Sequence, residues 1–189
     1  TADALAGSIG LDKLSATGTK SSSTFLRGDN TFASAGGDNT PFFMAYRSGT
    51  QTGVNGNTWT DIVHNAEDSD LSSAYDTSTG RFTPQTAGFY QINLTAMARD
   101  FGGSSTQSLQ QVMYGIFKNT ETDPRSTNFI DLSTDEVTRF VPTVSTVIQL
   151  NGSTDYVVSK VYIVGNSGSV HGERQYTNFS GFRLITWVH

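Results

Sequence analysis

The stretch from residue 89 to residue 99 constrains the fold of this chain more than any other. Apolar side chains occupy every second position, at Tyr90, Ile92, Leu94, Ala96 and Ala98. The positions between them are mostly polar, namely Gln91, Asn93, Thr95 and Arg99, with Phe89 and Met97 among them. Because successive side chains of a strand point to opposite faces, this period of two predicts a strand with one face in a core.

Short strands separated by turns are predicted over most of the chain. Turn-forming residues such as Gly80, Pro84 and Gly88 precede the alternating stretch. Further strands are expected at 42–47, 58–64, 111–118, within 138–150, at 156–164 and at 175–188, with a short strand or loop at 129–132. The segment 156–164 is apolar on both faces, which predicts a central strand or one buried against a partner subunit. About eight or nine strands without a convincing helix indicate an all-β antiparallel sandwich or jelly roll.

Composition excludes several classes of function. The formal net charge of −5 over 189 residues disfavours nucleic-acid binding, since affinity for phosphates comes from Lys and Arg. The chain has no cysteine, so disulfides and thiolate metal sites are excluded. No apolar run approaches the roughly 20 residues of a membrane-spanning helix, and the first residues do not resemble a signal peptide. The missing initiator Met suggests a piece of a longer protein.

Residues 1–40 differ in character from the rest. Their aromatic residues are Phe25 and Phe32, and small or polar residues separate a few scattered aliphatic ones. Such a segment buries too little apolar surface to offset the entropy of ordering the backbone, about 1–2 kcal/mol per residue. We therefore expect an extended N-terminal stalk at 1–40, either a disordered linker or a thread that packs against copies of itself, followed by a folded domain at 41–189.

Short motifs in the folded part occur in a fixed order. They are Asn65 before Tyr75-Asp76, then Thr79-Gly80-x-Phe82, Gly88-x-Tyr90, Lys118-Asn119, Asp155-Tyr156-Val157 and Phe179-Ser180-Gly181-Phe182-x-Leu184. In this order and spacing they resemble the globular heads of complement component one, subcomponent q, over roughly residues 42–187, although Thr154 stands where that family has a glycine. The resemblance implies a jelly roll of about ten strands, related to tumour necrosis factor, that associates as a tight homotrimer. It further implies that residues 90–98 and 156–164 contribute to the trimer interface, and some members of the family bind calcium.

The N-terminal segment carries a second resemblance. Residues 14–32, which end in Leu26-Arg27-Gly28-Asp29-Asn30-Thr31-Phe32, are similar to a linker of bacteriophage tail fibres and related viral adhesins. In those proteins the usual ending has a glycine and a tryptophan where this chain has Asn30 and Phe32. A tail-fibre linker before a trimeric jelly roll implies a receptor-binding tip.

Two residue groups are candidate metal ligands. Glu67, Asp68 and Asp70 lie in a predicted acidic loop at 66–73 and form a possible Ca²⁺ site, although no Asp-x-Asp-x-Asp-Gly pattern fixes its geometry. A solvated acidic loop is the alternative. The histidines at positions 64, 171 and 189 lack the spacing of zinc ligands.

Reactive motifs are few. Arg27-Gly28-Asp29 spells an integrin-binding tripeptide, but Gly28-Asp29-Asn30 is also a simple turn. The sequence contains no nucleophile elbow and no Walker loop. Glycoside hydrolysis needs paired carboxylates, and the dense candidates besides residues 67–70 are Asp131, Asp135 and Glu136. Both groups are expected in exposed loops, so we expect no enzymatic activity and no cofactor.

Ligand contacts are expected in the loops at 66–73, 101–108, 119–131 and 165–174. Sugars stack on exposed aromatic rings and form hydrogen bonds with polar side chains. The candidate contacts are Phe101, Asn128, His171, Glu173, Arg174 and Tyr176. Packing in the core or in the trimer is the alternative for Phe101, Phe129 and Tyr176.

These observations favour a receptor-binding adhesin at the tip of a bacteriophage tail fibre. It would be a virion protein, assembled in the host cytoplasm, that attaches to a host-surface receptor, a glycan or a protein, without membrane insertion. Three identical sites would raise weak affinity through multivalency. The alternatives are a structural trimerisation cap without receptor binding and a fibre-borne glycan hydrolase.

Overall fold

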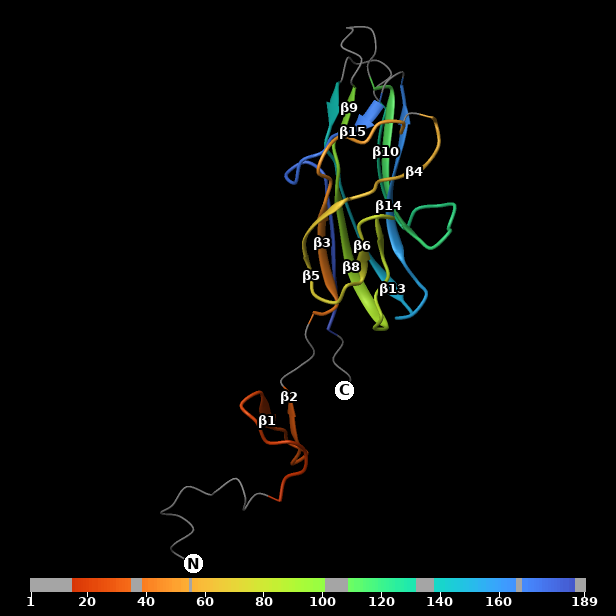
Figure 1. Cartoon of the computed structure of the whole chain (residues 1–189). Coiled ribbons are helices and arrows are strands. Elements are labelled where there is room, and N and C mark those ends of the chain that lie inside the picture. The colour runs from red at the N-terminus through yellow and green to blue at the C-terminus, as the bar shows by residue number, and fades with distance from the viewer. Residues whose placement is uncertain are drawn as a thin grey trace, which may run out of the picture. The chain divides into compact units, whose positions relative to one another are not determined.

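The computed structural model describes residues 15–34, 39–54, 56–100, 109–131, 138–165 and 168–185 (Figure 1). The chain forms two compact units. One runs from Asn39 to Leu184 and is called the head below; the other includes residues 15–34. The described residues include no helix long and apolar enough to cross a membrane.

The head consists of antiparallel strands in two main sheets and one small sheet (Figure 1). The first main sheet has the order β13 (Thr143–Leu150), β8 (Gly88–Thr95), β16 (Asn178–Arg183), β3 (Phe42–Tyr46) and β5 (Ala66–Asp70). The second has the order β11 (Ser126–Asp131), β10 (Gln111–Lys118), β14 (Val157–Val164), β7 (Arg81–Phe82) and β6 (Tyr75–Asp76), and β4 (Thr60–Asp61) also pairs with β14. The small sheet has the order β12 (Arg139–Phe140), β9 (Ala98–Asp100) and β15 (Gly168–Val170). Most sheet neighbours are distant in sequence, as in a jelly roll, and the predicted fold class is confirmed.

Strand β8 and its continuation into β9 supply the centre of the core. Tyr90, Ile92, Leu94, Ala96 and Ala98 are all fully buried, as the alternation predicts. Side chains from β10 and β14, in the opposite sheet, belong to the same cluster, among them Val112 and Val161. The head therefore has one core between two sheets.

Aromatic rings from the family-like motifs meet in this core. The ring of Phe43 in β3 lies 4.9 Å from Tyr75, 4.4 Å from Phe82 and 5.1 Å from Phe179, measured between ring centroids. Burying one such side chain contributes about 1.5–3 kcal/mol. The motifs that carried the resemblance are therefore positions where the two sheets pack together.

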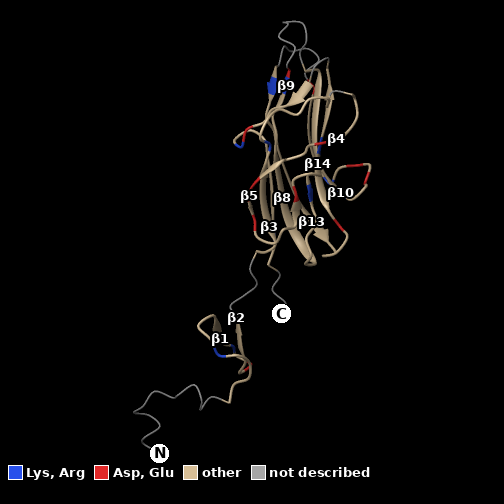
Figure 2. Ribbon diagram, viewed as in Figure 1, with Lys and Arg blue, Asp and Glu red and all other residues tan. Residues whose placement is uncertain are grey.

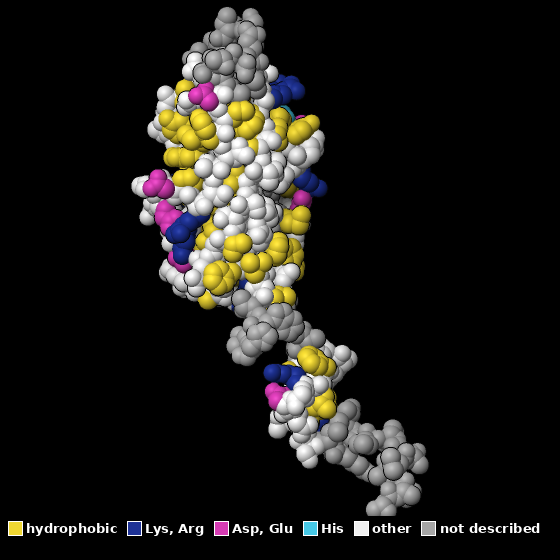
Figure 3. Space-filling model, turned by 180° about the vertical axis from the view of Figure 1, so that it is seen from behind, with side chains coloured by type: hydrophobic (Ala, Val, Ile, Leu, Met, Phe, Trp, Pro, Cys, Tyr) yellow, Lys and Arg dark blue, Asp and Glu magenta, His cyan; other side chains and the backbone are white. Residues whose placement is uncertain are grey.

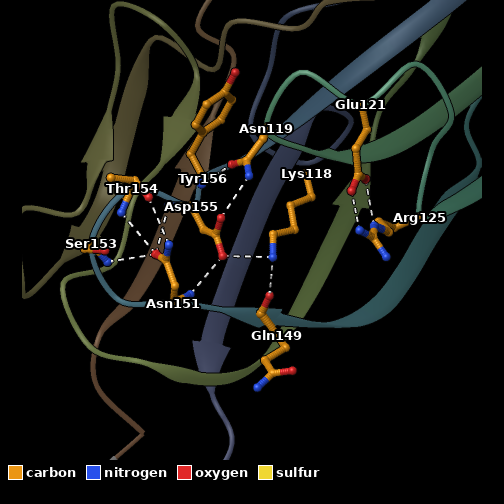
Figure 4. Close-up of polar contacts among 10 residues, drawn as sticks. All are labelled: Lys118, Asn119, Glu121, Arg125, Gln149, Asn151, Ser153, Thr154, Asp155 and Tyr156. Atoms are coloured by element: carbon orange, nitrogen blue, oxygen red, sulfur yellow. Dashed lines mark hydrogen bonds and ion pairs between the residues drawn. The ribbon is translucent and has the colours of Figure 1, made fainter.

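A group of hydrogen bonds and one ion pair, called the polar lock below, joins the end of β10 to the turn before β14 (Figure 4). The Asp155 carboxylate accepts a hydrogen bond from Asn119 Nδ2 at 2.8 Å and lies 2.8 Å from Lys118 Nζ. The Tyr156 backbone N–H donates to Asn119 Oδ1, and the Asn151 N–H donates to Asp155. Hydrogen bonds from Asn119 and Lys118 lower the pKa of Asp155 below its ordinary value. These polar motif residues therefore stabilise the fold.

Several predicted boundaries differ from the structure. Residues 66–70 form strand β5, not an acidic loop. This strand lies at the edge of its sheet, and edge strands commonly carry exposed charged side chains. Residues 168–170 form β15 within the predicted loop 165–174, and β11 covers residues 126–131 of the predicted loop 119–131. Of the predicted strand 58–64, residues 60–61 form a strand, which pairs with β14. The last strand starts at Asn178 rather than 175, because Thr177 N–H closes a turn on the Glu173 carbonyl.

The segment 156–164 is a central strand, as one of the two interpretations predicted. As β14 it pairs with β10, β7 and β4. Trp59, which precedes β4, packs against Tyr162 and Phe117 with ring centroids 5.8 Å and 5.0 Å apart. The apolar second face of β14 is therefore covered in part by the chain itself, and a partner subunit is not needed to explain it.

The unit that includes residues 15–34 contains a small hairpin of β1 (Thr24–Leu26) and β2 (Phe32–Ser34). Its connection is a turn in which Asn30 N–H donates to the Arg27 carbonyl at 3.0 Å. Arg27-Gly28-Asp29 thus belongs to a hairpin turn, which was the simpler of its two interpretations. Phe25 and Leu26 remain 47% and 41% exposed within this unit.

Candidate ligand-binding site

The outer face of the first main sheet, the face turned away from the core, runs the length of the head. On β8 it presents Phe89, Gln91, Asn93 and Thr95, and none of these four is buried. Residues 42 and 182 pair at one end of this sheet, where the chain enters and leaves the head. At the opposite end β8 passes into β9 of the small sheet, where the site described next is found.

A short turn at residues 171–177 forms one wall of this site. His171 N–H donates to the Met97 carbonyl at 2.8 Å, and Glu173 N–H donates to the Arg47 carbonyl at 2.8 Å. Inside the turn, the N–H groups of Tyr176 and Thr177 donate to the Glu173 carbonyl. Backbone hydrogen bonds therefore fix the turn to two neighbouring segments.

Two backbone features distinguish the turn, and the first of them permits its close approach to residue 49. A Cβ atom added to Gly172 would lie 2.1 Å from the Gly49 nitrogen, so a larger residue does not fit without a backbone shift. Glu173 has a φ of 131°, a conformation that non-glycine residues rarely adopt. A strained conformation of this kind persists only where the surrounding structure holds it in place. Such conformations concentrate at functional sites.

Between this turn and the strands lies a cavity of about 500 Å³. It is lined by Met97, Arg99, Arg139, Val141, His171, Glu173 and Tyr176. Figure 2 shows basic segments near β9 at the upper end of the head. In Figure 3 a histidine side chain (cyan) is visible beside basic side chains (dark blue) towards the same end.

The cavity combines opposite charges with aromatic surface. Glu173 Oε1 lies 3.6 Å from His171 Nε2, and Glu173 Oε2 accepts a hydrogen bond from Gln175 Nε2 at 3.0 Å. The ring centroids of His171 and Tyr176 are 5.8 Å apart. His171 Nδ1 is buried and has no hydrogen-bond partner in the described part of the chain. The site can therefore bind a polar ligand through hydrogen bonds, charge and ring contact.

The structure brings together three of the six predicted ligand contacts, namely His171, Glu173 and Tyr176. Arg174 belongs to the same turn but forms an ion pair with Asp68 and lies over the Tyr46 ring, 4.6 Å from its centroid. Asn128 lies in β11 of the other main sheet, half-buried, rather than in a loop. Phe101 and the loop 101–108 lie outside the described residues.

The predicted calcium ligands are dispersed along β5 and hold other groups. Asp68 pairs with Arg174, and Asp70 Oδ2 accepts the Tyr75 N–H at 2.8 Å. Burial, together with the Asp70 charge, raises the pKa of Glu67. In the ranges that the structure describes, no three His, Asp or Glu side chains form a group that could hold a metal ion. Asp135 and Glu136, which were weighed with Asp131 as hydrolase carboxylates, lie outside those ranges.

The lining residues that the sequence did not predict as ligand contacts are Met97, Val141 and the two charged ones, Arg99 and Arg139. Arg99 was placed on the polar face of its strand, which was a usable signal. Its partner was not recognisable, because the pairing of Arg99 with Arg139 joins residues distant in sequence through a two-residue strand.

The outer face of the first main sheet is more apolar at its other end. Met44, Phe89, Val147 and Phe182 are 49%, 43%, 50% and 36% exposed. A second hollow of about 370 Å³ lies there, with Phe42, Met44 and Phe182 in its walls. Asn93 also lines this hollow, and its Oδ1 accepts a hydrogen bond from Ser145 Oγ, to which Gln91 Nε2 donates. We call the apolar end, Met44, Phe89, Val147 and Phe182, the apolar face.

Comparisons with known proteins identify the fold. No protein-family model and no curated protein matches the sequence. Among solved structures, murine APRIL at pH 5.0 matches with a TM-score of 0.55 and 7% sequence identity, over 76% of this chain and 98% of that chain. Murine APRIL at pH 8.5 matches with a TM-score of 0.54 and the same identity and coverage. The head therefore has a jelly-roll fold similar to that of murine APRIL.

Proposed function

We propose that this chain is the receptor-binding tip of a viral tail fibre and attaches as a homotrimer to a glycan on the host surface. The observation that carries the proposal is the cavity beside the 171–177 turn. It lies at the end of the sheet opposite to the paired residues Phe42 and Phe182, where the chain enters and leaves the head. A site at that end is available to a receptor when the other end is joined to a fibre.

The chemistry of the cavity supports binding rather than catalysis. Its described walls hold one carboxylate, Glu173, whereas glycoside hydrolysis ordinarily uses two. A histidine, a tyrosine ring and two arginines suit non-covalent recognition of a hydroxylated ligand. The similarity of residues 14–32 to tail-fibre linkers supports the viral context.

The apolar face supports self-association. Four large apolar side chains, each more than a third exposed, lie on one side of one sheet. Contiguous exposed apolar surface of this kind is typical of protein interfaces. Three copies joined through it would present three cavities and gain affinity by multivalency.

The trimer is tested by the mass of the intact chain in solution. We expect light scattering to give three times the 20.4 kDa of one chain. Val147→Glu places a charge on the apolar face and should yield monomers. Phe129→Glu is the matched control, because Phe129 is 53% exposed on β11 of the other sheet and should leave the trimer intact. A monomeric wild-type chain would contradict the proposal.

Receptor binding is tested with purified full chain and candidate host cells. We expect it to bind the cells and to reduce infection by the virus that carries it. A stable trimer that binds no host and does not compete would instead support the structural cap.

A further inference from the structure

Two arginines face each other in the cavity. Arg99 of β9 and Arg139 of β12 are direct partners in an antiparallel pair, as are their neighbours Ala98 and Phe140. Ala98 is fully buried and Phe140 packs against the core, so the two arginines lie on the opposite, outer side. Like charges directly opposite one another across two strands are destabilising. The pair therefore concentrates positive charge at one place in a chain whose net charge is −5.

The acidic side chain in the cavity is directed elsewhere. Glu173 accepts a hydrogen bond from Gln175 and lies beside His171 Nε2. None of the described acidic side chains forms an ion pair with Arg139. An anion that enters next to Arg139, opposite Arg99, would bring negative charge to the pair and accept paired hydrogen bonds from Arg139, which Arg forms with carboxylates and phosphates.

The remaining walls fit a sugar ring. Tyr176 is 38% exposed and Val141 is 44% exposed, so an aromatic ring and an apolar side chain stand beside the arginines. His171 and Glu173 supply polar atoms for hydroxyl groups. The volume of about 500 Å³ lies within the range of about 300–1,000 Å³ that is usual for small-ligand sites.

We infer that the cavity binds an anionic sugar, whose carboxylate or phosphate lies between Arg99 and Arg139 and whose ring packs against Tyr176. The inference rests on the proposed function and specifies its receptor as an acidic surface glycan. Binding is non-covalent and needs no reaction step.

The test uses the full chain on an array of immobilised sugars in three groups: carboxylated ones such as glucuronate and N-acetylneuraminate, phosphorylated ones such as mannose phosphate, and neutral ones such as glucose and mannose. We expect binding in at least one anionic group and none to the neutral sugars. The group that binds identifies the acidic function.

Variants then locate the contact. Arg139→Gln should weaken binding by about 10-fold or more, the usual effect of losing a hydrogen-bonded charge. Arg139→Lys should recover only part, because lysine keeps the charge but not the planar fork. Arg174→Gln removes the same charge from the 171–177 turn at a position that does not line the cavity and is held by Asp68, and this variant should bind like the wild type. Tyr176→Ala should weaken binding without a change of charge.

Several results would overturn the inference: equal binding to neutral sugars, no binding to any anionic group, or equal losses for Arg139→Gln and Arg174→Gln. If the wild type and Arg139→Gln attach equally well to host cells, the inference fails and the proposed function stands. If the wild type attaches to no host cells, the proposed function itself fails.

Discussion

A buried histidine should make the head sensitive to mild acid. His64 is fully buried and its ring stacks on Phe179, with centroids 5.5 Å apart. Burial, and to a smaller extent the charge of Arg47, lower the pKa of His64 to about 3, although the Ile62 carbonyl partly opposes this. The unfolded chain takes up a proton near the ordinary pKa of about 6.5. In the folded chain, His64 does not bind this proton until the pH falls to about 3.

The sign and size of the effect follow from this difference. Below about pH 6.5 the unfolded state binds more protons than the folded state, so acid favours unfolding. The contribution of His64 is complete above pH 6.5 and is lost progressively as the pH falls towards about 3. Each pH unit in this window costs about 1.4 kcal/mol, so the free energy of unfolding should fall by about 2 kcal/mol between about pH 7 and about pH 5.

Urea unfolding of the wild type and of His64→Gln measures this slope at several pH values and at a fixed chain concentration. The variant should be less stable at neutral pH, and its stability should change far less between about pH 7 and about pH 5. His64→Phe provides a second side chain that does not titrate. Asp155→Asn is the control, because the Asp155 carboxylate titrates below this window and its loss should leave the slope unchanged. A wild-type stability that stays constant down to about pH 5 would refute the argument.

Two further substitutions test the lock and the turn. Asp155→Asn removes the ion pair with Lys118 and should lower the free energy of unfolding by about 1–3 kcal/mol, measured by urea titration. An unchanged urea midpoint would show that the polar lock adds no stability. Gly172→Ala forces a Cβ atom against the Gly49 backbone and should displace the 171–177 turn, so that host-cell binding is lost while circular dichroism still reports a folded sheet protein. If this variant binds host cells as the wild type does, the position of the 171–177 turn is not needed for recognition.

The core of the fold was predictable because its signal is local. The alternation from Tyr90 to Ala98 marks which side chains are buried, and no distant residue is needed to recognise it. Edge elements were harder. Strand β5 is acidic and β15 is Gly-Ser-Val, and neither composition distinguishes a strand from a loop, since the hydrogen bonds to β3 and β9 come from remote parts of the chain.

The site was predictable only in part for the same reason. His171, Glu173 and Tyr176 lie within six residues, so the loop predicted at 165–174 and the start of the strand predicted at 175–188 brought all three close together. Arg99 and Arg139 meet through a register that no local pattern encodes. Arg174 has the right chemistry for a ligand contact, but Asp68 from another strand already holds it.

The direction of β3, β16 and β8 also has a mechanical consequence. Residue 39 precedes the end of β3 that pairs with the end of β16, and the 171–177 turn lies beyond the other end of these strands. Hydrogen bonds between antiparallel strands run perpendicular to the strand axes. A pull between a ligand in the cavity and the chain before residue 39 would therefore load these ladders in shear, with many bonds sharing the force at once rather than breaking one after another.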